Sequence, residues 1–168
     1  FGYFGLAGCE PPEKTIEGPL GYQWNKPEKF FLRETLQEIS GIGFEPNADS
    51  LMYAVNDEEG KIYAIRLKAT KEKMPHVKFG RQNDYEDLAW WQNQWWVLQS
   101  NGSIFRTGIN EDSTKAFENL VPRGEYETMA SNGPFLYAVC KHCQQEDTVL
   151  VHRLSADSSG VLAADKQY

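Results

Sequence analysis

The stretch "LMYAVNDEEGKIYAI" at residues 51–65 returns in altered form as "WWVLQSNGSIFRT" at residues 95–107. In both copies an apolar run leads into a polar turn containing glycine, and a second apolar run follows. The run "FLYAVC" at residues 135–140 aligns with the first run of each copy. The equivalent positions, at intervals of 43 and 41 residues, are Val55, Leu98 and Val139. A period of about 40–50 residues that holds about four strands is typical of a β-propeller.

The rest of the chain continues this pattern of short apolar runs separated by turns rich in Asn, Asp and Gly. Such turns are typical of β-hairpins, and no stretch keeps helical apolar spacing over three turns. We therefore predict an all-β fold. Residues 30–154 hold about three repeat units, whereas propellers close with about four to eight blades. The sequence thus predicts about three blades, half of a six-bladed β-propeller. The predicted strands are "EISGIGF", "SLMYAVN", "KIYAIRL", "HVKF", "YEDLAWW", "QWWVLQS", "SIFRTGI", "YETMAS", "FLYAVC" and "TVLVHRL".

The charge of the chain argues against one class of partner. The 168 residues carry 17 Lys and Arg against 24 Asp and Glu, a net charge of -7. Binding to nucleic acid phosphates needs clustered basic side chains. We therefore expect no nucleic-acid partner.

The first residues predict a processed and lipidated N-terminus. Residues 1–8, "FGYFGLAG", are apolar or glycine, too few to span a bilayer but typical of the end of a signal peptide. With Cys9 they form "LAGC", which resembles the bacterial lipobox, in which the cysteine is lipidated. Residues 9–29 then read as the lipidated Cys and a tether, and residues 30–168 as the partial propeller domain. This predicts a protein of the bacterial cell envelope, held to the membrane by a lipid anchor. The alternative is a buried N-terminal strand with a free thiol.

Three glutamates recur in step with the repeat, each near the start of a predicted first strand. The first strand of each propeller blade lines the central channel, so the three carboxylates are expected to converge there. The candidate metal ligands are Glu38, Glu86 and Glu127, and the nearby channel-lining candidates are Asp57, Asp84 and Glu125. Converging carboxylates repel, and a hard cation such as Ca2+, which prefers oxygen ligands, would neutralise them. The alternative is that the glutamates accept backbone hydrogen bonds and only fix the ring.

Several motifs, taken in order, resemble the SdiA-regulated (YjiK-like) family in its Bacteroidetes lipoprotein form. They are "LQEISGIGF", "YAVNDEEGKIYAI", "KFGRQNDYEDLAW", "VLQSNGSIF" and "PRGEYETMA". The resemblance implies a six-bladed propeller related to phytase-like esterases and to calcium-dependent lactonases, which hold calcium in the channel. The chain departs from the family in one respect, because the Gly that usually follows the channel glutamate is replaced by Asp87 and Thr128. The resemblance therefore does not imply close approach of a ligand to the backbone at these two positions.

The motif "CKHC" at residues 140–143 places Cys140 and Cys143 at a spacing found in disulfides, zinc sites and redox pairs. A single pair is half of a zinc motif, and the redox motif expects a βαβ context that is missing here. We therefore expect a disulfide or a pair of thiols.

These observations leave three functions open. The first is a cell-envelope lipoprotein whose acidic central channel binds a small ligand or a cation. The second is a calcium-dependent hydrolase of the lactonase or phytase type, in which the metal polarises the substrate oxygen. The third is a scaffold that binds an envelope protein through an exposed tryptophan face, although tryptophans of this kind more often pack in a core. The tryptophans concerned are Trp90, Trp91, Trp95 and Trp96.

Overall fold

The computed structural model describes residues 18–21, 24–32, 36–69, 72–107, 114–143 and 149–168. The chain divides into two units, residues 1–30 and 31–168, and all the strands of the described residues lie in the second. Within the described ranges, none of the helical structure is long and apolar enough to cross a membrane.

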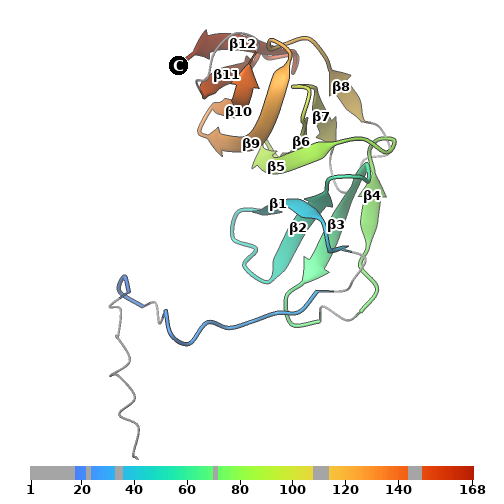
Figure 1. Cartoon of the computed structure of the whole chain (residues 1–168), viewed down its shortest axis with the longest axis vertical. Coiled ribbons are helices and arrows are strands. Elements are labelled where there is room, and N and C mark those ends of the chain that lie inside the picture. The colour runs from blue at the N-terminus through green and yellow to red at the C-terminus, as the bar shows by residue number, and fades with distance from the viewer. Residues whose placement is uncertain (1–17, 22–23, 33–35, 70–71, 108–113, 144–148) are drawn as a thin grey trace, which may run out of the picture. The chain divides into compact units, whose positions relative to one another are not determined.

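The second unit consists of three four-stranded antiparallel sheets (Figure 1). Each sheet is a meander in which consecutive strands are neighbours, so each repeat of the sequence forms one sheet. The first sheet contains β1 (Ile39–Phe44), β2 (Leu51–Asn56), β3 (Lys61–Arg66) and β4 (His76–Lys78). The second contains β5 (Tyr85–Trp91), β6 (Gln94–Gln99), β7 (Ile104–Thr107) and β8 (Lys115–Phe117). The third contains β9 (Gly124–Asn132), β10 (Phe135–Cys143), β11 (Leu150–Ala156) and β12 (Leu162–Gln167).

The all-β prediction is confirmed, and each run predicted as a strand coincides with one of the strands. Two strands were missed, β8 and β12, and both lie at the outer edge of their sheets. Each has one buried residue, Phe117 or Leu162, and the others are exposed. An edge strand with so little buried surface needs no apolar alternation, so the sequence gives no signal for it.

Apolar faces pack between consecutive sheets. Tyr53 and Val55 of the first sheet pack with Trp95 and Val97 of the second. On the opposite face of the second sheet, a larger cluster joins it to the third sheet through residues that include Trp91, Trp96, Met129, Leu136 and Leu154. Trp91, Trp95 and Trp96 are buried and Trp90 is partly buried, so this group does not form an exposed aromatic face.

The sheets are also linked by a hydrogen bond that repeats. The carbonyl of Asp57, just after β2, accepts from the N–H of Tyr85 at 2.9 Å, and the carbonyl of Ser100, just after β6, accepts from the N–H of Tyr126 at 2.8 Å. The Tyr85 hydroxyl donates to the carbonyl of Arg81, and the Tyr126 hydroxyl donates to the carbonyl of Pro122, in each case four residues earlier in the chain. As a result β1 contacts β5 and β5 contacts β9, so the first strands of the three sheets are neighbours in order.

Candidate functional site

The site is built on an irregularity shared by the first strands. In each sheet the pairing of the first and second strands slips by one residue near its start, which leaves one extra residue on the first strand. Such a β-bulge turns a side chain away from the regular alternation and is common beside functional sites. The extra residues are Ser40 in β1, Glu86 in β5 and Glu127 in β9.

This register corrects the predicted equivalence of the three glutamates. Glu86 and Glu127 occupy the same position, but their equivalent in the first sheet is Ser40. Glu38 precedes β1 and corresponds instead to Asp84 and Glu125. The error arose because the glutamates were matched by residue type, whereas the strand pairing matches Ile39 with Tyr85 and Tyr126 and so places Glu38 two residues before the equivalent position. The side chain of Ser40 donates to the carbonyl of Tyr85 at 2.6 Å, so this bulge links two sheets.

Glu86 lies beside other carboxylates. Burial, together with the negative charges of Asp84 and Glu127, raises the pKa of Glu86 to about 7. A hydrogen bond with Asp84 also raises this pKa, whereas one with the Ser100 hydroxyl lowers it. The structure therefore brings together Glu86, Glu127 and Asp84, three of the six acids singled out from the sequence. A carboxylic acid with a pKa near 7 is partly protonated at neutral pH and responds to any added positive charge.

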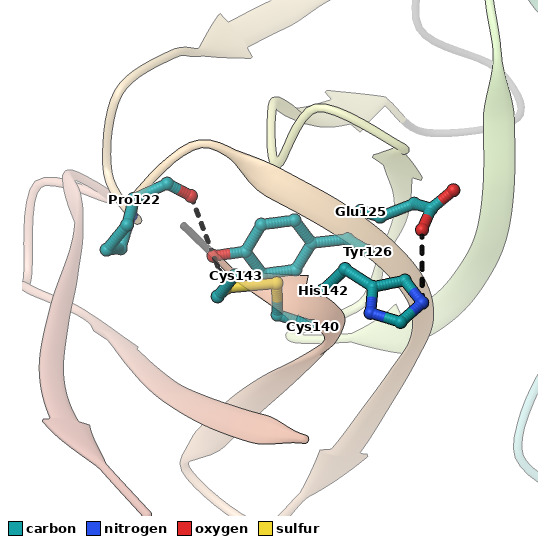
Figure 2. The surroundings of a disulfide bond; sticks show 6 residues. All are labelled: Pro122, Glu125, Tyr126, Cys140, His142 and Cys143. Atoms are coloured by element: carbon teal, nitrogen blue, oxygen red, sulfur yellow. Dashed lines mark hydrogen bonds and ion pairs between the residues drawn. A yellow bond between two sulfur atoms is a disulfide. The ribbon is translucent and has the colours of Figure 1, made fainter. Parts of the chain in front are cut away.

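Two cationic or titratable side chains, Lys141 and His142, border this group, and neither was predicted to lie beside the acids. The Lys141 ammonium lies 3.2 Å from a carboxylate oxygen of Glu127, and the charges of Glu125 and Glu86 also raise the Lys141 pKa. His142 Nε2 lies 3.7 Å from Glu125 Oε2 (Figure 2). Lys141 is the extra residue of a second bulge, this one on β10. The only signal in the sequence was its place inside "CKHC".

Glu38 and Asp57, two further predicted acids, line two different hollows. Glu38 lines a cavity of about 590 Å³ together with Glu59, Lys61 and Tyr63. There the Tyr63 hydroxyl donates to the Glu59 carboxylate, and Lys61 Nζ lies 2.7 Å from the same carboxylate, which lowers the Glu59 pKa. Asp57 and Asp84 line a second cavity of about 400 Å³. Glu38 is thus assigned to a different hollow from the one that Asp57 and Asp84 share.

Asp87, which follows Glu86, links two sheets. Its Oδ1 accepts from the N–H of Leu88 and its Oδ2 accepts from the N–H of Met129 in β9, both at 2.8 Å. Burial raises the Asp87 pKa to about 6, although these hydrogen bonds oppose the shift. The Asp87 side chain is therefore structural. We infer that the backbone at this position is occupied by contacts between sheets.

The donor chemistry of the site suits a hard cation, but a complete ligand set is not assembled. Carboxylate oxygens are ligands that Ca2+ prefers, and Lys141 already neutralises part of their charge. Within the described ranges, no three Asp, Glu, His or Cys side chains lie close enough together to hold a metal ion.

A disulfide lies beneath this surface. Cys140 and Cys143 are joined, with their Cα atoms 5.9 Å apart, and both cysteines are buried (Figure 2). The Cys143 sulfur lies 3.7 Å from the Tyr126 hydroxyl. Gly124 fits against the pair, since a Cβ there would lie 2.5 Å from the Cys140 sulfur. The disulfide holds the end of β10, where Lys141 and His142 face the acids.

No protein-family model matches the chain. A search of curated proteins also gives no match. The predicted lipidation site, Cys9, and the predicted signal-peptide residues 1–8 lie outside the described residues.

Proposed function

We propose that the chain is a β-propeller part of a bacterial cell-envelope lipoprotein of the SdiA-regulated type, and that its acidic channel mouth binds a positively charged ligand. The observation that carries the binding proposal is the placement of Glu86 and Glu127. They lie at the same bulge of neighbouring first strands, and the negative charge of Glu127 contributes to the raised pKa of Glu86. The resemblance in sequence motifs supports the family, and the lipobox supports the anchor at Cys9.

The raised pKa of Glu86 explains why positive charge would be attracted. At pH 7 this carboxyl is about half ionised, because its charge is disfavoured by burial and by Asp84 and Glu127. A cation placed between the carboxylates relieves the repulsion and releases the proton from Glu86. The Lys141 ammonium already neutralises part of the repulsion between the carboxylates. Its exposed side chain can move into solvent and leave room for the ligand. The shared chemistry of the ligand is positive charge, carried by a divalent metal ion or an organic amine.

Calorimetric titration tests this proposal. The chain is titrated with CaCl2 and, separately, with spermidine, as the wild type and as Glu86→Gln. A matched control is Glu72→Gln, which removes the same charge from an exposed position in the loop before β4. The proposal predicts binding of one of the two probes by the wild type and the control, and a loss of at least about tenfold in affinity in Glu86→Gln. Equal affinity in all three proteins, or no binding of either probe, would contradict it.

The same titration shows which of the two probes binds and whether its affinity depends on the protonation state of Glu86. Binding of calcium but not spermidine assigns a metal, and the reverse assigns an amine. Because Glu86 must lose its proton to act as a carboxylate, affinity should rise between about pH 6 and pH 8 and then level off. Glu86→Gln should lack this dependence.

A second function is favoured by one observation. A carboxylate with a pKa near 7 can act as a general base near neutral pH. We therefore keep a calcium-dependent hydrolase of lactones or phosphoesters as the alternative, with Glu86 as the base. Calcium-stimulated hydrolysis of a simple lactone or of p-nitrophenyl phosphate, lost in Glu86→Gln, would support it. Cation binding without turnover of either substrate would favour the binding function.

A further inference from the structure

The third sheet differs from the other two at the end of its second strand. β2 and β6 end at Asn56 and Gln99, which pair with the residue just before the bulge of the first strand. The equivalent residue of β10 is Cys140, but this strand continues past it to Cys143. The second strand of the third sheet is therefore extended, and the extension runs beside the start of β9.

The extension brings a positive charge to the acids of β9. Lys141 is the extra residue of its bulge, as Glu127 is of the facing bulge in β9, and the two bulges are separated by a single residue pair. The Lys141 ammonium lies 3.2 Å from a carboxylate oxygen of Glu127. The hydrogen bond with Glu127 raises the Lys141 pKa, and the charges of Glu125 and Glu86 raise it as well. A cation of the chain itself thus lies where we propose that a cationic ligand binds.

The other two sheets carry no positive charge at this position. The residues equivalent to Lys141 are Asp57 in the first sheet and Ser100 in the second. A sheet of this type is therefore built without a cation here. The lysine is a feature of the third sheet alone among the three, and it accompanies the extension of β10.

The disulfide fixes the backbone on both sides of this lysine. It joins Cys140 to Cys143 and so closes a short ring of chain that contains Lys141 and His142 (Figure 2). Both cysteines are buried, whereas the two residues between them are exposed in succession. Closing a ring removes conformational freedom from the residues inside it. The ring also lies against Tyr126, whose hydroxyl is 3.7 Å from the Cys143 sulfur.

We propose that Lys141 is an autoinhibitory cation, which the Cys140–Cys143 disulfide holds beside Glu127 and which a positively charged ligand has to displace. This inference rests on the proposed function, because it concerns the same acidic site. The Lys141 and Glu127 side chains are 54% and 41% exposed, and ion pairs with that much exposure are weak. The lysine therefore lowers the affinity of the site for cations without closing it.

Calorimetric titration of Lys141→Met with CaCl2 and with spermidine tests the competition. Methionine keeps an apolar side chain of similar length and removes the charge. Affinity for the probe that the wild type binds should rise about threefold to tenfold. The matched control is Lys78→Met, which removes the same charge from an exposed position on β4, the outer strand of the first sheet. It should leave the affinity unchanged.

The part played by the disulfide is tested by a double-mutant cycle. Cys140→Ala together with Cys143→Ala removes the bond and keeps the two positions apolar. Without the ring Lys141 is no longer held, so Lys141→Met should raise the affinity less in this background than in the wild type. If circular dichroism shows that the alanine pair is unfolded, wild-type and Lys141→Met chains reduced with dithiothreitol replace it. The dithiol takes the place of the bond by exchange, leaving two cysteine thiols and the cyclic disulfide of the reagent.

The outcomes separate this inference from the proposed function. No binding of either probe by any of these proteins refutes the proposed function, and this inference with it. Binding by the wild type with equal or weaker affinity in Lys141→Met overturns the autoinhibitory role alone. An equal gain from Lys141→Met with and without the disulfide overturns the role of the bond in holding the lysine.

Discussion

At the scale of single residues, Asp87 shows how one side chain can fasten two sheets. Its carboxylate accepts one hydrogen bond within β5 and another from the N–H of Met129 in β9. Asp87→Ala would leave both N–H groups without this acceptor. We expect it to lower the free energy of unfolding by about 1–3 kcal/mol. Asp87→Asn retains one carbonyl acceptor and should lose less, and urea unfolding of the two variants gives the comparison. Equal stability of Asp87→Ala and the wild type would show that the link contributes nothing.

Glu86 makes stability depend on pH in a definite direction. Its pKa is about 7 in the folded chain against an ordinary value of 4.5, so between these values the folded state binds more protons than the unfolded state. The free energy of unfolding should therefore fall as pH rises through this window. Glu86→Gln removes the charge and should be more stable than the wild type near pH 8, by about 1 kcal/mol after allowance for solvent screening.

Urea unfolding near pH 5 and near pH 8 measures that effect. The difference between Glu86→Gln and the wild type should be large only at the higher pH. Glu72→Gln, the same substitution at an exposed site, should show neither effect. A wild-type chain more stable than Glu86→Gln at both pH values would contradict the assigned environment of Glu86.

At the scale of elements, the turn between β6 and β7 is closely fitted to the next sheet. Gly102 has φ of +88°, and a Cβ there would lie 2.8 Å from the Tyr126 ring. Gly102→Ala should therefore destabilise the chain by about 1–3 kcal/mol. Gly133 in the β9–β10 turn also has positive φ, +57°, but a Cβ there meets nothing within 4 Å. Gly133→Ala should cost less, and the difference in thermal unfolding reports the contact with Tyr126.

The strands were predictable because their residues obey local rules. The apolar runs of β2, β5 and β6 are buried over most of their length, and Asn, Asp and Gly mark their ends. The edge strands β8 and β12 bury one residue each and leave no such pattern.

The candidate site was predictable only in part. Repetition of a glutamate identified Glu86 and Glu127, but it misplaced the equivalent residue of the first sheet, which is Ser40. The prediction matched residues by type, whereas the equivalence is set by the pairing between strands, which matches Ile39 with Tyr85 and Tyr126. Lys141 was missed because its position beside Glu127 depends on a bulge in β10, which the pairing between strands decides.

At the scale of the whole molecule, the account depends on how the first strands of successive sheets are placed. The link from Ser100 to Tyr126 sets β9 beside β5 and so brings Glu127 near Glu86. Neither residue is near the other in sequence, and each belongs to a different sheet. The electrostatic coupling of the two carboxylates is therefore a direct consequence of sheet-to-sheet packing, and it can be measured.

The most direct measurement is an NMR titration of the glutamate side-chain carboxyl carbons, with the Glu86 signal assigned by its absence in Glu86→Gln. The account predicts that Glu86 titrates near pH 7 in the wild type, and at lower pH in Glu127→Gln, which removes a neighbouring negative charge. The lowering should be partial, because burial is the largest cause of the shift and Asp84 remains. Glu72→Gln should leave the titration unchanged. A Glu86 carboxyl that titrates near its ordinary value of 4.5 in the wild type, or one indifferent to Glu127→Gln, would contradict the account.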